Sequence, residues 1–165
     1  KAIRRQRQMC IRDSINGLYA VMMNLARETA RDGEGATKLM ECVVDHAPTE
    51  AVAKSVALSV INSSLLKAAI FAADANWGRI LCAIGYAEGD FDISKVEVVL
   101  SSSKGSVKVC ENGAGVDFSE DEAFKILSED EIVIRIDMHD GADKSVAWGC
   151  DLTYEYVKIN AEYRS

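Results

Sequence analysis

The spacing of apolar residues predicts a helix followed by a strand near the start of the chain. Five apolar residues lie three or four positions apart, as on one face of a helix: Leu18, Val21, Met22, Leu25 and Ala26. Ser14 or Asn16 is a suitable N-terminal cap for this helix, and Gly33 follows its last turn. Residues 38–45 carry Leu, Met, Cys and two Val in a short run, which predicts a strand.

The middle of the chain is rich in Ala, Val and Leu and predicts helices. A proline that suits a first helical turn comes just before residues 51–65, where we expect a helix. The apolar run over residues 66–73 is too short for its period to decide, and it is either a buried strand or the end of that helix. Asp74 or Asn76 can cap a further helix over residues 77–86.

The second half of the chain is more β in character and predicts two strand pairs. Residues 96–100 and 107–110 should form a hairpin. Residues 131–137 place three isoleucines at alternate positions, as a half-buried strand does. We expect this strand to pair with residues 144–150 through a turn at Asp140-Gly141.

Two more helices complete the prediction. Ser119 and Glu122 have the spacing of a capping box, which predicts a helix over residues 120–127. Residues 152–160 are expected to form a short helix before an irregular tail. Helices and strands therefore mix without a strict βαβ alternation. This favours an α+β or layered α/β fold, with mixed sheets and flanking helices, over a Rossmann fold.

Composition narrows the classes of function. The 165 residues carry a net charge of −7, which argues against a nucleic-acid partner. There is no apolar run of roughly 18 residues, so we expect no membrane span. The five cysteines are widely spaced and form no C-x-x-C pair, as expected for free thiols in a reducing compartment. His46 and His139 are isolated, so we predict no metal site and treat both as surface or packing residues.

Residues 1–14 differ from the rest of the chain in charge. Five of the nineteen Lys and Arg residues lie in the first twelve positions. Residues 7–14 (Arg-Gln-Met-Cys-Ile-Arg-Asp-Ser) resemble a translated library adapter. We therefore interpret residues 1–14 as partly or wholly non-native and residues 15–165 as the domain. A basic arm or the end of an Arg-rich transit peptide is the alternative, and either way the segment is left out of the fold prediction.

The most informative motif is Arg-Asp-Gly-Glu-Gly-Ala-Thr-Lys over residues 31–38, where two glycines flank a carboxylate. Glycine adopts positive φ without penalty, so the loop can turn sharply and hold Glu34 away from the scaffold. A desolvated carboxylate held in this way suits recognition of an amine. The simpler interpretation is that Gly33 is a left-handed helix cap and Glu34 is solvated.

Two further motifs favour the binding role of Glu34 over the simpler interpretation. Residues 70–80 read Ile-Phe-Ala-Ala-Asp-Ala-Asn-Trp-Gly-Arg-Ile, and residues 151–165 read Asp-Leu-Thr-Tyr-Glu-Tyr-Val-Lys-Ile-Asn-Ala-Glu-Tyr-Arg-Ser. Together with the Glu34 loop and in this order, they resemble the C-terminal part of the bifunctional ornithine acetyltransferase / glutamate N-acetyltransferase family of arginine biosynthesis. The similarity runs from about Ile15 to the last residue.

The resemblance implies a layered α/β/β/α fold and a precursor that cuts itself before a threonine. The new N-terminal threonine of the β chain is the family's nucleophile, and it passes an acetyl group from N-acetylornithine to glutamate. No external cofactor is needed, because the acetyl group travels on the enzyme. The α chain of the same precursor stays bound, and two α and two β chains form the assembly.

The resemblance also assigns substrate-binding residues in this chain. It implies that Glu34, Asn160 and Ser165 contact the substrate, with Ser165 standing where the family usually has threonine. The change keeps the hydroxyl and loses a methyl group. Without the resemblance, Ser165 reads as a frayed end and Asn160 as a helix C-cap.

Two other candidates have structural explanations. In Asn76-Trp77-Gly78-Arg79, Asn76 suits an N-cap, Trp77 a core position and Gly78 a close-packing point, and Arg79 is a possible partner for a substrate carboxylate. Gly35-Ala36-Thr37 resembles the family's cleavage site, but Met does not follow the threonine. Thr37 is therefore not the nucleophile. The spacing of a phosphate-binding loop is absent too.

The chain thus carries no catalytic residue of its own, and we predict that it is inactive alone. Two other classes stay open: a non-catalytic module that binds a partner through its acidic surface, and a related N-terminal-nucleophile peptidase. The motif over residues 151–165 speaks against the peptidase. The free cysteines favour the cytoplasm, or the mitochondrion if the source is a fungus or similar eukaryote.

Overall fold

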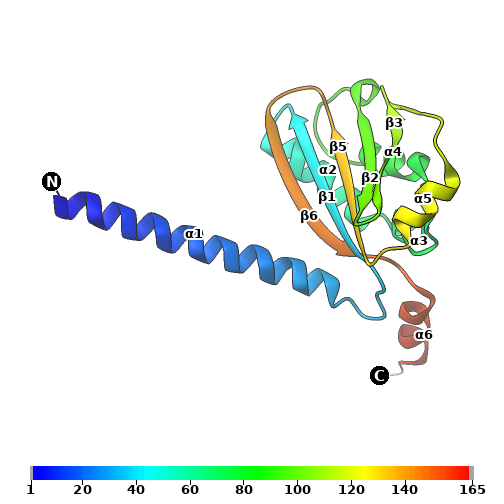
Figure 1. The fold of residues 1–165 in the computed structure, drawn as a ribbon, viewed down its shortest axis with the longest axis horizontal. Helices are drawn as coiled ribbons and strands as arrows, with labels where there is room; N and C mark the ends of the chain where they lie inside the picture. Colours follow the sequence, from blue (N-terminus) through cyan, green and yellow to red (C-terminus); the bar gives the residue numbers. More distant parts are fainter. Residues whose placement is uncertain (1, 164–165) are drawn as a thin grey trace.

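The computed structural model describes residues 2–163 and consists of one mixed sheet with helices (Figure 1). The elements in chain order are α1 (Ala2–Arg31), β1 (Leu39–Ala47), α2 (Glu50–Asn62), α3 (Ser64–Phe71), α4 (Trp77–Gly85), the 3-10 helix η1 (Ile93–Lys95), β2 (Glu97–Ser102), β3 (Gly105–Glu111), β4 (Ala114–Gly115), α5 (Glu120–Leu127), β5 (Glu131–Asp137), β6 (Asp143–Cys150) and α6 (Tyr154–Glu162). The predicted α+β class, with a mixed sheet and flanking helices, is confirmed.

The six strands form one sheet in the order β4-β3-β2-β5-β1-β6. β1 runs parallel to β5 and antiparallel to β6, so β1 lies between them. The predicted direct pairing of residues 131–137 with 144–150 is therefore wrong, although both strands exist. β1 carries apolar residues at most positions and can be buried between two neighbours, whereas β6 has exposed polar residues at its start and lies at the edge.

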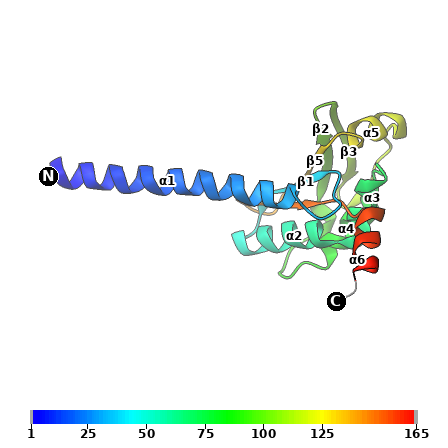
Figure 2. The ribbon, with the colours of Figure 1, turned by 90° about the horizontal axis from the view of Figure 1, so that it is seen from below.

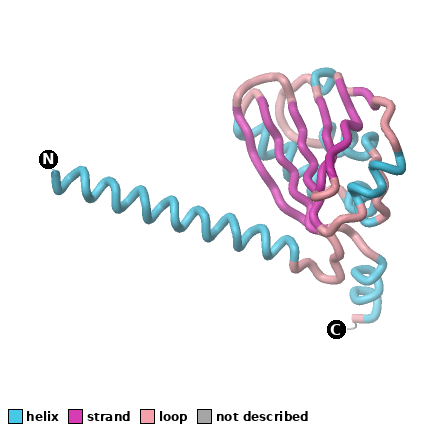
Figure 3. Tube along the Cα trace, viewed as in Figure 1, coloured by secondary structure: helices cyan, strands magenta, loops and turns pink. Residues whose placement is uncertain are grey.

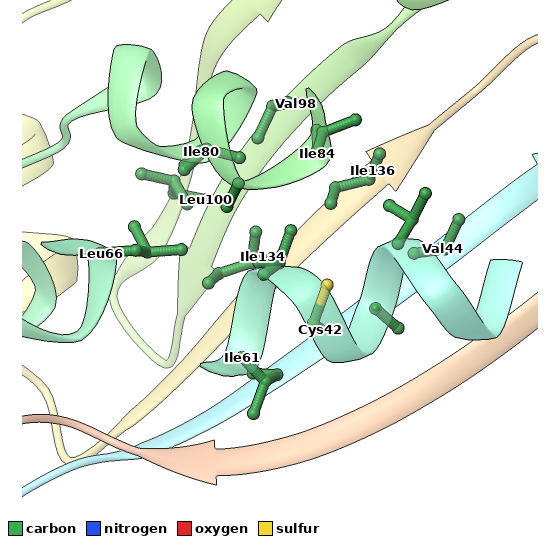
Figure 4. Packing of buried hydrophobic residues seen from close by; sticks show 14 of the residues in the cluster. Cys42, Val44, Ile61, Leu66, Ile80, Ile84, Val98, Leu100, Ile134 and Ile136 are labelled. Carbon is green, nitrogen blue, oxygen red and sulfur yellow. The ribbon is translucent and has the colours of Figure 1, made fainter. Parts of the chain in front are cut away.

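Helices cover one face of the sheet. α2 packs on β1 and β6, and α4 packs on α2 (Figures 1 and 2). Alternate residues of the strands point into this layer, among them Cys42, Val44, Ile134 and Ile136 (Figure 4). Residues between them, such as Val43, are only partly covered, because the structure describes no layer on the opposite face. The period-two alternation of strand side chains thus separates a buried face from a bare one.

α1 extends away from the sheet, and only its last turns touch β6 and β1 (Figure 3 and Figure 2). The helix begins at Ala2, so the expected caps Ser14 and Asn16 lie inside it. Arg27 and Arg31 donate hydrogen bonds to the Glu131 carboxylate of β5 at 2.6 and 2.7 Å. These ion pairs join the last turns of the helix to β5.

A break at Ser63 divides the apolar middle of the chain into two helices. The Ser63 hydroxyl accepts a hydrogen bond from the Leu66 backbone N–H, which starts α3. Residues 66–73 are therefore neither a strand nor the end of the preceding helix. No single described helix is long and apolar enough to cross a membrane. α2 and α3 together meet that test, but they are bent by 58° and both bury residues in the core.

Features that depend on neighbouring residues agree with the sequence prediction. Asn76 caps α4 and Ser119 caps α5, each accepting a hydrogen bond from the backbone N–H three residues later. β2 and β3 form the predicted hairpin. α6 lies where a short terminal helix was expected, and it brings residues 154–162 back beside the loop that follows α1 (Figure 1).

Candidate functional site

The loop between α1 and β1 needs both of its glycines, for different reasons. Gly35 has φ +67°, and a Cβ there would lie 2.9 Å from the Tyr156 backbone N of α6. Gly33 does not adopt positive φ, so its predicted role as a left-handed cap is wrong. A Cβ at Gly33 would instead lie 2.5 Å from the Cys150 Sγ. The first glycine therefore permits close packing on β6, and the second permits the turn beside α6.

Glu34 lies between these glycines and meets α6. The Asn160 side-chain amide donates a hydrogen bond to the Glu34 Oε2 at 2.7 Å and another to the Tyr156 carbonyl at 2.9 Å. Asn160 lies within α6 and Tyr163 is the C-cap, so Asn160 is not a C-cap. The expected convergence of the early loop and the end of the chain is thus present for Glu34 and Asn160. Ser165 lies outside the described residues.

The pair is open to solvent in this chain. Both Glu34 and Asn160 are exposed, so the described residues do not by themselves desolvate the Glu34 carboxylate. Among residues 2–163 no hydrogen bond engages the Glu34 Oε1 or the Asn160 Oδ1. Two acceptor oxygens of this hydrogen-bonded pair therefore have no partner among these residues, and such oxygens suit an ammonium group, which has donors only.

Asp151, which was not predicted as a functional residue, holds the C-terminal end of the loop by hydrogen bonds. Its side chain is buried, with 3% of the residue exposed. Its carboxylate accepts hydrogen bonds from the Thr37 N–H at 2.8 Å, the Lys38 N–H at 3.0 Å and the Thr37 hydroxyl. A buried carboxylate needs such donors, because an unpaired one is costly in a low-dielectric interior. Thr37 thus has a structural partner, which agrees with excluding it as the nucleophile.

Comparison with known proteins identifies the family. The sequence model of the ArgJ family matches residues 5–165. The chain belongs to the ArgJ family. The arginine biosynthesis bifunctional protein ArgJ of Caldanaerobacter subterraneus subsp. tengcongensis is 54% identical over 148 residues, which cover 90% of this chain and 37% of that protein. The corresponding protein of Thermotoga neapolitana is 46% identical, with 90% and 37% covered.

A solved ArgJ structure has the same fold. The crystal structure of arginine biosynthesis bifunctional protein argJ from Bacillus halodurans matches with a TM-score of 0.85 and 41% identity, over 92% of this chain and 70% of that chain. The family resemblance inferred from the three motifs is therefore confirmed. The chain spans little more than a third of the length of the curated ArgJ relatives named above.

Lys38 joins the ArgJ loop to two helices. Its ammonium group donates hydrogen bonds to the carbonyl oxygens of Ile70 and Leu127, each at 2.7 Å, at the ends of α3 and α5. Burial lowers the pKa of Lys38 from its ordinary value, while the carboxylates of Asp151 and Asp130 oppose that shift. A cation at helix C-termini also complements the negative ends of the helix dipoles.

The Asn76 motif of this ArgJ chain has a structural role that differs from the prediction in two places. Asn76 is the expected N-cap, but Trp77 is 39% exposed and is not a core residue. Gly78 has open space where a Cβ would be, apart from an ordinary contact with Asn76, so it is not a close-packing point. Arg79 donates to the Leu65 carbonyl at 2.8 Å.

The two histidines lie at the C-terminal end of β1, away from the Glu34 loop. His46 and His139 stack with ring centroids 6.3 Å apart, and both contact the Asp137 carboxylate. Both rings are exposed, as predicted for surface residues. Within the described part of the chain, no group of three or more His, Cys, Asp and Glu side chains has metal-binding geometry. All five cysteines are free, and burial raises the pKa of Cys42 above its ordinary range.

Proposed function

We propose that this chain is part of an acetyltransferase of arginine biosynthesis, which moves an acetyl group from N-acetylornithine to glutamate through an acetyl-threonine intermediate. Its contribution is to bind and orient the amino-acid substrate through Glu34, Asn160 and Ser165. The nucleophilic threonine belongs to a part of the enzyme outside these residues, so the chain alone has no activity. Family membership and the names of the ArgJ relatives support this proposal.

The single observation that carries the substrate-binding role is the contact between Glu34 and Asn160. The carboxylate supplies negative charge, and the amide holds it in one orientation. The free Glu34 Oε1 and Asn160 Oδ1 can then accept hydrogen bonds from the ammonium group of an amino acid. Hydrogen bonds between charged groups are roughly twice as strong as neutral ones, so this small site can bind a small ligand. A covering layer that excludes water would strengthen it further.

The bare face of the sheet supports the proposal that more protein packs on this chain. Valines and a tryptophan on that face are only partly covered: Val43, Val99, Val133, Val146 and Trp148. Apolar side chains that line an open sheet mark an interaction surface. We propose that the α chain of the same precursor covers this face and that two α and two β chains assemble. We propose a cytoplasmic location for the reaction. The named relatives are bacterial and give no support to a mitochondrial one.

The test uses a chimera in which this chain replaces the matching segment of the Caldanaerobacter ArgJ protein. We expect the chimera to exchange acetyl groups between N-acetylornithine and glutamate, and the purified 165-residue chain to show none. Glu34→Gln in the chimera should raise KM for N-acetylornithine by about 100-fold, because an ammonium ligand loses its charged partner. Glu88→Gln, which changes an exposed carboxylate after α4, is the matched control and should behave like the unmodified chimera.

Two results would contradict the proposal. Acetyl exchange by the isolated chain would show that its nucleophile lies within these residues. A folded chimera that binds its partner chain without transferring acetyl groups would favour the non-catalytic binding module. Assays with N-acetylornithine and with acetyl-CoA as donors then show whether one or both acetyl sources are used.

A further inference from the structure

We infer that Thr153 and Asp151 are positioning residues for the Glu34–Asn160 pair. The inference rests on the proposed function, because it concerns how that binding pair is formed. Glu34 and Asn160 are 126 residues apart in the sequence and both are exposed, so their own contact is too weak to hold two segments together. Something buried must fix the loop against α6.

Thr153 makes that connection with one hydroxyl group. The residue is 4% exposed and is the N-cap of α6. Its Oγ1 accepts a hydrogen bond from the Tyr156 N–H at 3.2 Å and donates one to the Gly35 carbonyl at 2.6 Å. The hydroxyl therefore starts the helix that carries Asn160 and fastens the loop that carries Glu34. Its two bonds use both its donor and an acceptor, so no other side chain of this size except serine can replace it.

Asp151 fixes the other end of the same loop. Its three accepted hydrogen bonds hold Thr37 and Lys38, and its own N–H donates to the Lys38 carbonyl at 3.2 Å. The loop is thus bound on both sides of Glu34, at Gly35 and at Thr37. Gly35 also packs so closely on the first turn of α6 that a side chain has no room there. These contacts fix the backbone on the C-terminal side of Glu34, from which its carboxylate reaches Asn160.

The geometry gives Thr153 a role that a helix cap alone does not have. Substituting an N-cap lowers the stability of its helix wherever the helix lies. Losing the bond to Gly35 should in addition let the loop move, so that Glu34 and Asn160 no longer present their free oxygens together. The expected signature is a KM effect with kcat nearly unchanged, because the residue touches neither substrate nor reacting atoms.

The first experiment uses the 165-residue chain and needs no activity. In a ¹⁵N-labelled sample, the side-chain amide resonance of Asn160 is assigned by its loss in Asn160→Asp and reports on the contact with Glu34. Glu34→Gln should move this resonance, and Thr153→Val should move it in the same direction. Thr153→Ser should restore the native position. Thr49→Val removes a hydroxyl that caps α2 in the same way, with no bond to a loop, and should leave the resonance in place.

The second experiment measures kinetics in the Caldanaerobacter chimera. We expect Thr153→Val to raise KM for N-acetylornithine about tenfold with kcat within about threefold, and Asp151→Asn to have a similar effect. Thr153→Ser and Thr49→Val should retain the kinetics of the unmodified chimera. If Thr153→Val does not fold, Thr153→Ala and Asp151→Asn carry the test, with Thr49→Val as the control.

The two experiments separate failure of this inference from failure of the proposed function. An unmoved Asn160 resonance in Thr153→Val, or equal kinetic effects of Thr153→Val and Thr49→Val, would overturn the positioning role. An inactive chimera with the expected shifts in the amide resonance would keep the positioning role and refute the proposed reaction.

Discussion

The two ends of strand β1 both carry clusters of ionisable side chains, but only the cluster at its start contains a fully buried member, Asp151. At the start of the strand, Asp151 and Lys38 lie against the core, and each makes several hydrogen bonds. At its other end, His46 and His139 share the Asp137 carboxylate in an exposed turn. A hydrogen bond to a buried charge cannot be replaced by water, whereas an exposed one can. The more deeply buried cluster should therefore contribute more to the free energy of unfolding.

The largest expected effect is at Asp151. Asp151→Ala removes the acceptor for two backbone N–H groups and one hydroxyl, so the free energy of unfolding should fall by about 3 kcal/mol. Urea unfolding followed by circular dichroism measures the change. A loss below about 1 kcal/mol would mean that water replaces the carboxylate and that the cluster is not effectively buried.

Lys38→Met should come second, with a loss of about 2 kcal/mol at neutral pH, because two helix-terminal carbonyls lose a charged donor. The pH dependence sharpens the test. Since burial lowers the pKa of Lys38 in the folded state, the unfolded chain binds more protons between that pKa and its unfolded value near about 10.4. The native chain should therefore gain stability relative to Lys38→Met as pH rises through the folded-state pKa toward the unfolded value. A constant difference would contradict the lowered pKa.

Asp137→Ala provides the exposed counterpart of Asp151→Ala. The carboxylate accepts hydrogen bonds from the His46 ring at 2.8 Å and the His139 N–H at 2.9 Å. Because solvent can take over both interactions, we expect a loss of no more than about 1 kcal/mol in the same urea experiment. An effect as large as that of Asp151→Ala would remove the contrast between the two ends of the strand.

The smallest effect is expected at a second exposed cluster, where α1 meets β5. Hydrogen bonds from Arg27, then the charges of Arg27 and Arg31, lower the pKa of the Glu131 carboxyl. The resulting stability is present above the carboxyl's unfolded pKa and is lost as pH falls through the folded value. Glu131→Gln should cost less than about 1 kcal/mol near neutral pH, since both sides of the pair are partly exposed. The difference should disappear in acid and shrink in about 1 M salt.

Local features of the fold were predictable, while those set by distant partners were not. Ser119 caps α5 because its hydroxyl needs only the N–H three residues later, which the sequence specifies. The partner of β5 was predicted wrongly because nothing near residues 131–137 indicates that β1 inserts between β5 and β6. The break between α2 and α3 depends on Ser63, a single capping residue inside an apolar stretch.

In the candidate site, too, local features were predictable and contacts between distant residues were not. The resemblance assigned Glu34 and Asn160 to substrate binding, which stays a prediction, and the structure shows that the two residues are in contact. Their spacing in the sequence alone does not indicate this contact. The roles of Asp151 and Thr153 were not predicted, because Asp and Thr are usually surface residues. The sequence does not show that these two are buried and hydrogen-bonded to the loop. Thr153 offered one signal, since a threonine just before a predicted helix is a common N-cap. Its second bond to Gly35 has no local signature.

The position of β1 has a consequence for how the domain is made. β1 is synthesised before its sheet neighbours β5 and β6, because α2, α3, α4, β2, β3, β4 and α5 all lie between them in the sequence. Until β5 and β6 have been synthesised, both edges of this apolar strand lack the partners that they have in the folded sheet, which exposes the nascent chain to aggregation. Such late, long-range pairing also slows folding once synthesis is complete.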